Sequence, residues 1–118
     1  MDDAHFPKDH RLRKRHEFLS VMRKGRKVVT RHWVFVAKSN GTAQSRLGVT
    51  ITKRVGGAVV RNRLKRQLRE YFRLGGVSGS GLDIVVIGRN SAVDADFLAG
   101  RKSFDLGLKK LGELKLEG

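Results

Sequence analysis

Residues 53–73 read KRVGGAVVRNRLKRQLREYFR, and this segment carries most of the information about the architecture. The glycine pair at 56 and 57 can open a helix over residues 58–73. Advancing about 100° per residue places five apolar side chains within one arc of about 120°. They are Val60, Leu64, Leu68, Tyr71 and Phe72. This pattern predicts a helix that packs one face against a sheet.

The same helix carries a strip of cationic side chains beside its apolar face. The strip occupies an adjoining arc of about 100° and contains Asn62, Lys65, Arg66, Arg69 and Arg73. Glu70 is the only acidic residue in the whole segment. A face exposed only to solvent would normally mix in glutamates, because like charges at i,i+4 spacing are destabilising. A solvated polar face remains the alternative, but the pattern favours a surface that binds a polyanion.

Arg61 falls within the apolar arc, on the first turn of the predicted helix. A guanidinium there costs stability unless something pairs it. Its side chain therefore either extends off the helix start or points at a ligand. Lys53 and Arg54 precede the two glycines, so cations and free helix amides converge where a phosphate could bind. The sequence G-x-x-x-x-G-K-[ST] is absent, which argues against a phosphate-loop nucleotide hydrolase.

Upstream of this segment, the sequence predicts one helix and two strands. Apolar residues recur at helical spacing over Arg15–Lys24, and Gly25 follows as a stop. Residues 28–37, VVTRHWVFVA, are rich in β-branched and aromatic side chains and predict a strand. Asn40-Gly41 then predicts a turn before a second strand over residues 46–52.

Downstream, the sequence predicts a loop, a strand and a helix. Residues 75–81, GGVSGSG, indicate the loop, and the apolar run Leu82–Gly88 indicates a strand covered on both faces. Asp94 can cap the last helix, although Gly100 and Gly107 argue against its continuity. The order helix, strand, strand, helix, strand, helix predicts an α/β (α+β) two-layer sandwich.

The composition limits the classes of protein that fit. The 118 residues suit one domain over residues 1–118, with residues 1–12 as an irregular basic arm. A formal charge of +15 with 39% hydrophobic residues predicts a packed domain whose partner is nucleic acid and not a membrane. The absence of cysteine excludes disulfides, cysteine zinc sites and thiol nucleophiles. No apolar segment suits a membrane span or a signal peptide, so we expect a cytoplasmic protein.

The residue pattern predicts no catalytic residue and no metal site in the protein. A nuclease that uses two metal ions needs converging carboxylates, whereas the acids here are dispersed. His5, His10, His16 and His32 all lie in the first third of the chain. A histidine acid–base pair is conceivable, but added charge and hydrogen bonds to RNA explain these residues better.

The alternation within residues 32–36 separates two sets of side chains. Trp33 and Phe35 would point to one face of the strand, and His32, Val34 and Val36 to the other. Large aromatic side chains more often fill a core, which leaves the second set for RNA. The alternation alone leaves the reverse assignment open.

The central helix carries a motif that identifies a family. Arg61-Asn62-Arg63, followed by Leu64-Lys65-Arg66 and Arg69-Glu70, resembles the RNR signature of the protein subunit of bacterial ribonuclease P. The resemblance covers nearly the whole chain. It includes Phe18, Gly25, Arg46-Leu47-Gly48-Val49, Lys53-Arg54-Val55-Gly56 and Asp83-Ile84-Val85-Val86.

The resemblance implies a division of labour between protein and RNA. In that family a partner RNA performs the phosphodiester chemistry with Mg²⁺, which is bound mainly by the RNA. The protein binds this catalytic RNA and the 5′ leader of precursor tRNA, without an obligate protein partner. The fold implied is like that of the second domain of ribosomal protein S5, with a left-handed βαβ crossover into the signature helix, against the usual right-handed rule.

The resemblance also assigns two sets of binding residues. The set expected to contact the catalytic RNA is Lys53, Arg54, Arg61, Asn62, Arg63, Lys65, Arg66 and Arg69. The set expected to line a cleft for the single-stranded leader is Phe18, Met22, His32, Val34 and Val36. Gly57, Met22 and Val36 depart from the family pattern, and fewer aromatic side chains should weaken base stacking in the cleft.

Composition alone would equally support two other classes of protein. One is a ribosomal or general RNA-binding protein that has no catalytic partner. The other is an architectural domain that places its basic helix in a groove of DNA. The spacing of the RNR signature favours the ribonuclease P subunit over both.

Overall fold

The computed structural model describes residues 10–75 and 80–114. Its elements, in chain order, are α1 (Arg15–Lys24), β1 (Arg26–Val29), β2 (Trp33–Ser39), β3 (Arg46–Thr50), α2 (Ala58–Leu74), β4 (Leu82–Gly88), the 3-10 helix η3 (Asn90–Asp94) and α3 (Phe97–Gly112). The strands form one sheet in the order β1-β2-β4-β3. β4 is antiparallel to β2 and parallel to β3. Because α2 connects β3 to β4, these elements form a βαβ unit, whose left-handed crossover stays a prediction.

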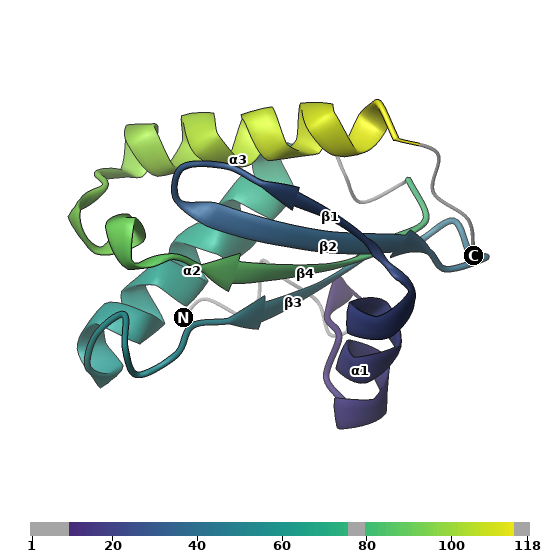
Figure 1. Ribbon diagram of the computed structural model, residues 1–118, viewed down its shortest axis with the longest axis horizontal. Coiled ribbons are helices and arrows are strands. Elements are labelled where there is room, and N and C mark those ends of the chain that lie inside the picture. The colour runs from purple at the N-terminus through teal and green to yellow at the C-terminus, as the bar shows by residue number, and fades with distance from the viewer. Residues whose placement is uncertain (1–9, 76–79, 115–118) are drawn as a thin grey trace.

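Helices cover both faces of the sheet (Figure 1). α2 and α3 pack on one face and close the main core, to which they contribute Leu64, Leu68, Tyr71, Phe72, Phe104 and Leu111. α1 lies across the other face, above β2 and β4, over a smaller apolar cluster. The predicted α/β sandwich is therefore confirmed, with α1 as a partial layer on the second face.

The register of the central strands confirms which side chains fill the main core. Trp33 and Phe35 on β2 are buried there, beside Ile84 and Val86 of β4. Their neighbours along β2 point to the face of α1, as the alternation predicts. The assignment of the two aromatic side chains to the core is thus correct.

The segment predicted as one strand over residues 28–37 is wrong in detail. It contains a turn between β1 and β2, in which the N–H of Thr30 donates to the carbonyl of Trp33 at 2.9 Å. The hydroxyls of Thr30 and Ser103 lie 2.7 Å apart, so α3 helps to hold this turn. No glycine, proline or asparagine marks it, and for that reason the sequence pattern missed it. The order of elements therefore has one strand more than predicted.

α2 begins where the sequence predicts and extends one residue further, to Leu74. Four members of its predicted apolar arc, Leu64, Leu68, Tyr71 and Phe72, are buried, and Val60 packs partly buried against them. The last helix differs from its prediction, since Asp94 ends η3 and Asp96 caps α3. The side chain of Asp96 accepts the N–H of Ala99 at 2.8 Å.

The basic arm is only partly irregular where the structure describes it. Residues 1–9 of the arm and residues 76–79 of the predicted loop lie outside the described residues. Leu12 is buried, and its N–H donates to the carbonyl of Leu47 at 2.9 Å. Arg11 pairs with Leu47 in a parallel bridge. The end of the arm is thereby attached to the edge of the sheet, contrary to the prediction for residues 11 and 12.

Candidate nucleic-acid interface

The outward face of α2 presents cations that no other described residue engages. Asn62 and Arg66 are exposed, and Lys65 and Arg69 are half-buried. Across residues 10–75 and 80–114, none of these four side chains makes a hydrogen bond or ion pair within the chain. Arg73 differs, because its guanidinium is paired with Glu70. The predicted strip thus exists, except that Arg73 is engaged within the chain.

Arg61 and Arg63 are both tethered at the start of α2. One guanidinium nitrogen of Arg61 donates to the carbonyl of Gly56 at 2.9 Å. One of Arg63 donates to the carbonyl of Val93 at 3.2 Å, which links α2 to η3. The Arg61 side chain therefore folds back over the helix start, as the first of the two alternatives for this residue predicts. Both hydrogen bonds orient a guanidinium and use only part of its five N–H groups.

The N-terminus of α2 has a charge distribution that opposes helix stability. Gly57 is the N-cap residue and supplies no side-chain acceptor, and the first turn contains no acidic residue. Lys53 and Arg54 are exposed in the preceding loop. Cations at the positive end of a helix dipole are unfavourable, whereas an anion there is stabilised. This arrangement suits a phosphate group.

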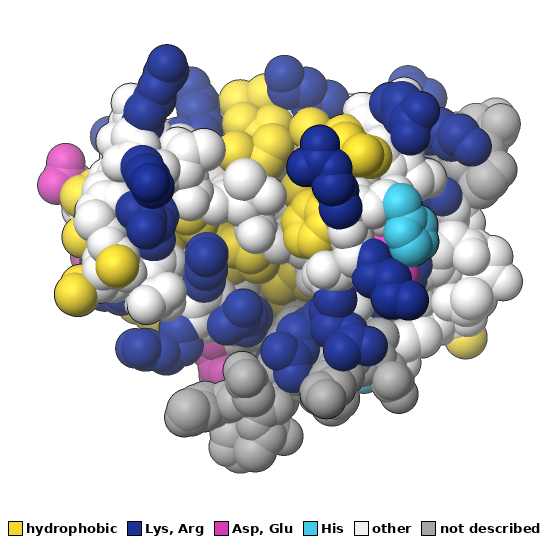
Figure 2. Space-filling view, turned by 90° about the horizontal axis from the view of Figure 1, so that it is seen from below, with side chains coloured by type: hydrophobic (Ala, Val, Ile, Leu, Met, Phe, Trp, Pro, Cys, Tyr) yellow, Lys and Arg dark blue, Asp and Glu magenta, His cyan; other side chains and the backbone are white. Residues whose placement is uncertain are grey.

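A second surface lies beside α1 on the same face of the sheet. Here Val29, Val34, Ile87 and Thr50 pair in register across β1, β2, β4 and β3, and none of the four is buried. We call these four residues the open strip. Figure 2 shows this face, where hydrophobic side chains gather in the middle and Lys and Arg side chains surround them.

The side chain of Phe18 on α1 borders the open strip. The residue is half-buried and packs on the small apolar cluster under α1. Its ring lies directly above Gly48 of β3, where an added Cβ would come within 2.6 Å of Cε2. The glycine therefore allows the ring to approach the sheet closely. Met22, one helical turn further on, is 44% exposed.

Two of the five residues predicted to line the leader cleft offer little surface. Val36 is only 4% exposed because α1 covers it, and it packs in the small apolar cluster beneath Phe18. His32 is 7% exposed, and its Nδ1 lies 3.0 Å from the hydroxyl of Ser91. Burial and the charge of Arg31 lower the pKa of His32, which favours its neutral form. His32 and Val36 therefore offer little surface in the free chain, whereas Phe18, Met22 and Val34 are accessible, and the assignment of all five to the leader stays a prediction.

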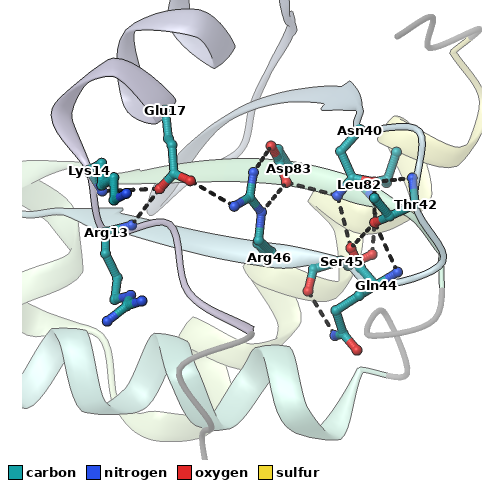
Figure 3. A network of polar contacts seen from close by, with 10 residues as sticks. All are labelled: Arg13, Lys14, Glu17, Asn40, Thr42, Gln44, Ser45, Arg46, Leu82 and Asp83. Carbon is teal, nitrogen blue, oxygen red and sulfur yellow. Dashed lines mark hydrogen bonds and ion pairs between the residues drawn. The ribbon is translucent and has the colours of Figure 1, made fainter.

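Sequence reasoning missed a polar network that joins α1 to the sheet (Figure 3). The Arg46 guanidinium donates to Glu17 at 2.8 Å and to both oxygens of Asp83, at 3.0 and 2.8 Å. Asn40 also donates to Asp83, at 2.8 Å. We call Glu17, Arg46 and Asp83 the Arg46 clamp. The sequence signal that could have revealed it is a charged residue near the start of each of two apolar strands, Arg46 in β3 and Asp83 in β4.

The electrostatics of the clamp favour permanent ionisation. Burial opposes the charge of Glu17, but the N–H groups of Lys14 and Arg13 and the Arg46 guanidinium outweigh it and lower the pKa to about 2. Hydrogen bonds to Asp83 raise the pKa of Arg46, against the opposing effect of its burial. Glu17 and Arg46 therefore act as fixed charges near neutral pH.

The described residues contain no cluster suited to a metal ion. No three His, Cys, Asp or Glu side chains come together in residues 10–75 and 80–114. Glu17 and Asp83 are both ion-paired with Arg46. In the same part of the chain, no helix has the length and apolar character to cross a bilayer.

The sequence matches the family Ribonuclease P over residues 6–112. The chain belongs to the ribonuclease P protein family. It is 46% identical over 90 residues to the ribonuclease P protein component of Desulforapulum autotrophicum, covering 75% of this chain and 77% of that relative. It is 41% identical over 105 residues to that of Shouchella clausii, covering 87% and 86%.

Solved ribonuclease P proteins have the same fold. The protein from Thermotoga maritima superposes with a TM-score of 0.76 at 35% identity, covering 89% of this chain and 97% of that one. The protein from Staphylococcus aureus gives a TM-score of 0.79 at 32% identity, covering 86% and 94%. The chain is therefore a protein component of ribonuclease P, and its α/β fold is the one found in that family.

Proposed function

We propose that the chain binds the catalytic RNA of ribonuclease P through α2 and holds the 5′ leader of precursor tRNA beside α1. It thereby assists Mg²⁺-dependent removal of the leader, which leaves the mature 5′ end. The observation that carries the proposal is the free cationic face of α2, whose side chains find no acidic partner in residues 10–75 and 80–114. Such a face neutralises phosphates and releases their counterions.

The second surface suits a single strand better than a duplex. Single-stranded RNA is bound by aromatic or apolar platforms for the bases, with cations along the backbone. Phe18 and the open strip supply the platform, and the surrounding Lys and Arg side chains supply the cations (Figure 2). The exposed side chain one helical turn after Phe18 on α1 is Met22, which is not aromatic. The platform therefore has few rings on which bases can stack, and we expect it to bind bases weakly.

The proposed catalyst is the partner RNA. Residues 10–75 and 80–114 hold no group of three or more His, Cys, Asp or Glu side chains that could hold a metal ion, which supports placing Mg²⁺ on the RNA. We assign Mg²⁺ mainly to RNA phosphates. The role of the protein is to position the substrate and to screen the repulsion between two RNA molecules with its charge of +15.

Cleavage of precursor tRNA at low Mg²⁺ tests the proposal. The reaction is run with the organism's catalytic RNA alone, with the protein alone and with both. Activity that rises in the mixture, with one cut at the mature 5′ end, would support it. Cutting by the protein alone would contradict the assignment of catalysis to RNA. Binding without stimulation would indicate a general RNA-binding protein.

The first variant tests the docking face. We expect Arg69→Ala to weaken binding of the catalytic RNA and to reduce the salt slope by about one unit, because one phosphate contact is lost. Lys102→Ala, which removes an exposed cation from α3, should leave the slope unchanged. Binding is measured across a salt series. Equal slopes for Arg69→Ala and the wild type would show that α2 is not the docking face.

The second variant tests the leader surface. We expect Phe18→Ala to weaken binding of precursor tRNA by about 1–3 kcal/mol per stacked base, with little effect on mature tRNA. Leu19→Ala, the next residue on α1 and 40% exposed, is the matched control and should affect neither RNA. The measurement is the affinity of the assembled ribonucleoprotein for both RNAs. An equal loss for the two RNAs would contradict the proposed leader site.

A further inference from the structure

The position of α1 over the sheet depends on few contacts. Val21 is the only buried residue of this helix. The C-terminal end is held by the chain itself, because Gly25 leads directly into β1 and lies against Val36 and Ala37. The N-terminal end follows Leu12, whose N–H donates to the carbonyl of Leu47 at the edge of the sheet. Beyond that bond, other contacts are needed to hold the first turn and Phe18 in place.

The Arg46 clamp supplies those contacts. Glu17 immediately precedes Phe18, and both oxygens of its carboxylate accept hydrogen bonds. One oxygen accepts the N–H groups of Arg13 and Lys14, at 3.1 and 3.0 Å, which caps the start of the helix. The other accepts from Arg46 on β3 at 2.8 Å. The first turn of α1 is thereby tied to the edge of the sheet.

The clamp is built to resist displacement of its central residue. Arg46 meets Asp83 through two parallel hydrogen bonds, a geometry that fixes the plane of the guanidinium. The Asp83 side chain is only 5% exposed and is held again by Asn40. Glu17 therefore binds to a group that cannot follow it if the helix moves. Figure 3 shows the three residues in line between α1 and β4.

We propose that Arg46 is a positioning residue, which holds the first turn of α1 through Glu17 and so sets the distance between Phe18 and the open strip. This inference rests on the proposed function of that surface in binding the leader. Arg46 itself touches no RNA in this scheme. It acts through α1, by keeping the ring of Phe18 at a fixed distance from the open strip.

The test compares Glu17→Ala with a control of equal charge change. Glu17→Ala removes the contact to Arg46 and the hydrogen bonds to Arg13 and Lys14, and it leaves the Arg46–Asp83 pair intact, so the sheet should remain folded. Asp105→Ala removes one acid from the exposed Arg101–Asp105 pair on α3. Each protein is assembled with the catalytic RNA, and the affinities for precursor and mature tRNA are measured. The quantity of interest is the affinity for precursor tRNA divided by the affinity for mature tRNA.

We expect Glu17→Ala to lower this ratio roughly three- to tenfold, because a displaced aromatic ring loses part of its stacking. Asp105→Ala should keep the wild-type ratio. Glu17→Gln retains an oxygen for the backbone N–H groups but loses the charge that faces Arg46, so its ratio should be intermediate. It also serves as the test variant if Glu17→Ala does not fold. A wild-type ratio in a folded Glu17 variant would overturn the proposal.

A double-mutant cycle separates positioning from a general loss of stability. If Glu17 acts through Phe18, then Glu17→Ala should change the ratio little in a Phe18→Ala background. Additive losses would overturn the proposal. The same cycle distinguishes failure of the proposed function, since Phe18→Ala alone would then leave the ratio unchanged. A low ratio for Phe18→Ala with a wild-type ratio for Glu17→Ala would refute the clamp alone.

Discussion

Arg46→Ala should cost about 3–5 kcal/mol of the free energy of unfolding, because it leaves a buried carboxylate without its cation. Among the described residues, Asp83 would then retain only Asn40 as a side-chain partner, in a site where 5% of its side chain is exposed. Urea unfolding measures the loss. The free energy of unfolding of a small domain is only about 5–15 kcal/mol, so the variant should be largely unfolded at elevated temperature.

The control for this variant is an ion pair of the same chemistry at the surface. Arg101→Ala breaks the pair with Asp105, whose atoms lie 3.6 Å apart and whose side chains are 38% and 51% exposed. Such pairs contribute about 0–1 kcal/mol. Similar losses for Arg101→Ala and Arg46→Ala would mean that the burial of Asp83 does not determine the effect.

The pH dependence of stability gives an independent check on the clamp. The pKa of Glu17 is lowered from 4.5 to about 2 in the folded chain. Its contribution is therefore present above about pH 4.5 and is lost as the pH falls toward 2. Arg46→Ala removes one cause of the low pKa, so stability should depend less steeply on pH in this interval. An unchanged profile would show that the backbone N–H groups alone hold the charge.

The central helix was predictable because several signals coincide in it. Its apolar arc, its cationic strip and the preceding glycines all occur within residues 53–73. Each signal is local, so the period of the helix relates them without knowledge of the rest of the fold. β4 was predictable for a similar reason, since its run of apolar residues is continuous and bounded by glycines.

The errors arise where distant parts of the chain decide the local structure. The turn between β1 and β2 is held by Ser103 of α3, more than seventy residues away. Val36 belongs to the predicted leader face by alternation, but α1 lies over it. The clamp joins positions 17, 46 and 83, and no periodicity relates three elements so far apart. The family motif predicts a binding face on α2 but carries no information about these contacts.

Gly107→Ala should destabilise the protein by about 1–3 kcal/mol, although alanine is the better helix former. A methyl group at this buried position would overlap the ring of Phe35, which fills the main core from β2. Phe35 packs in turn on Phe104, with ring centroids 5.4 Å apart, so it has little room to move. The glycine that argues against a continuous helix is therefore the residue that lets α3 approach the sheet.

Gly112→Ala on the same helix is the matched control. Apart from its chain neighbours and the helix's own backbone, no atom of the described residues lies within 4 Å of an added Cβ there, and the position is exposed. This substitution should leave stability unchanged or raise it by up to about 1 kcal/mol, since only helix propensity changes. The measurement is the thermal unfolding temperature of the two variants. Their difference separates the effect of close packing at position 107 from the effect of helix propensity. If Gly107→Ala were as stable as Gly112→Ala, α3 could not lie as close to β2 as the structure has it.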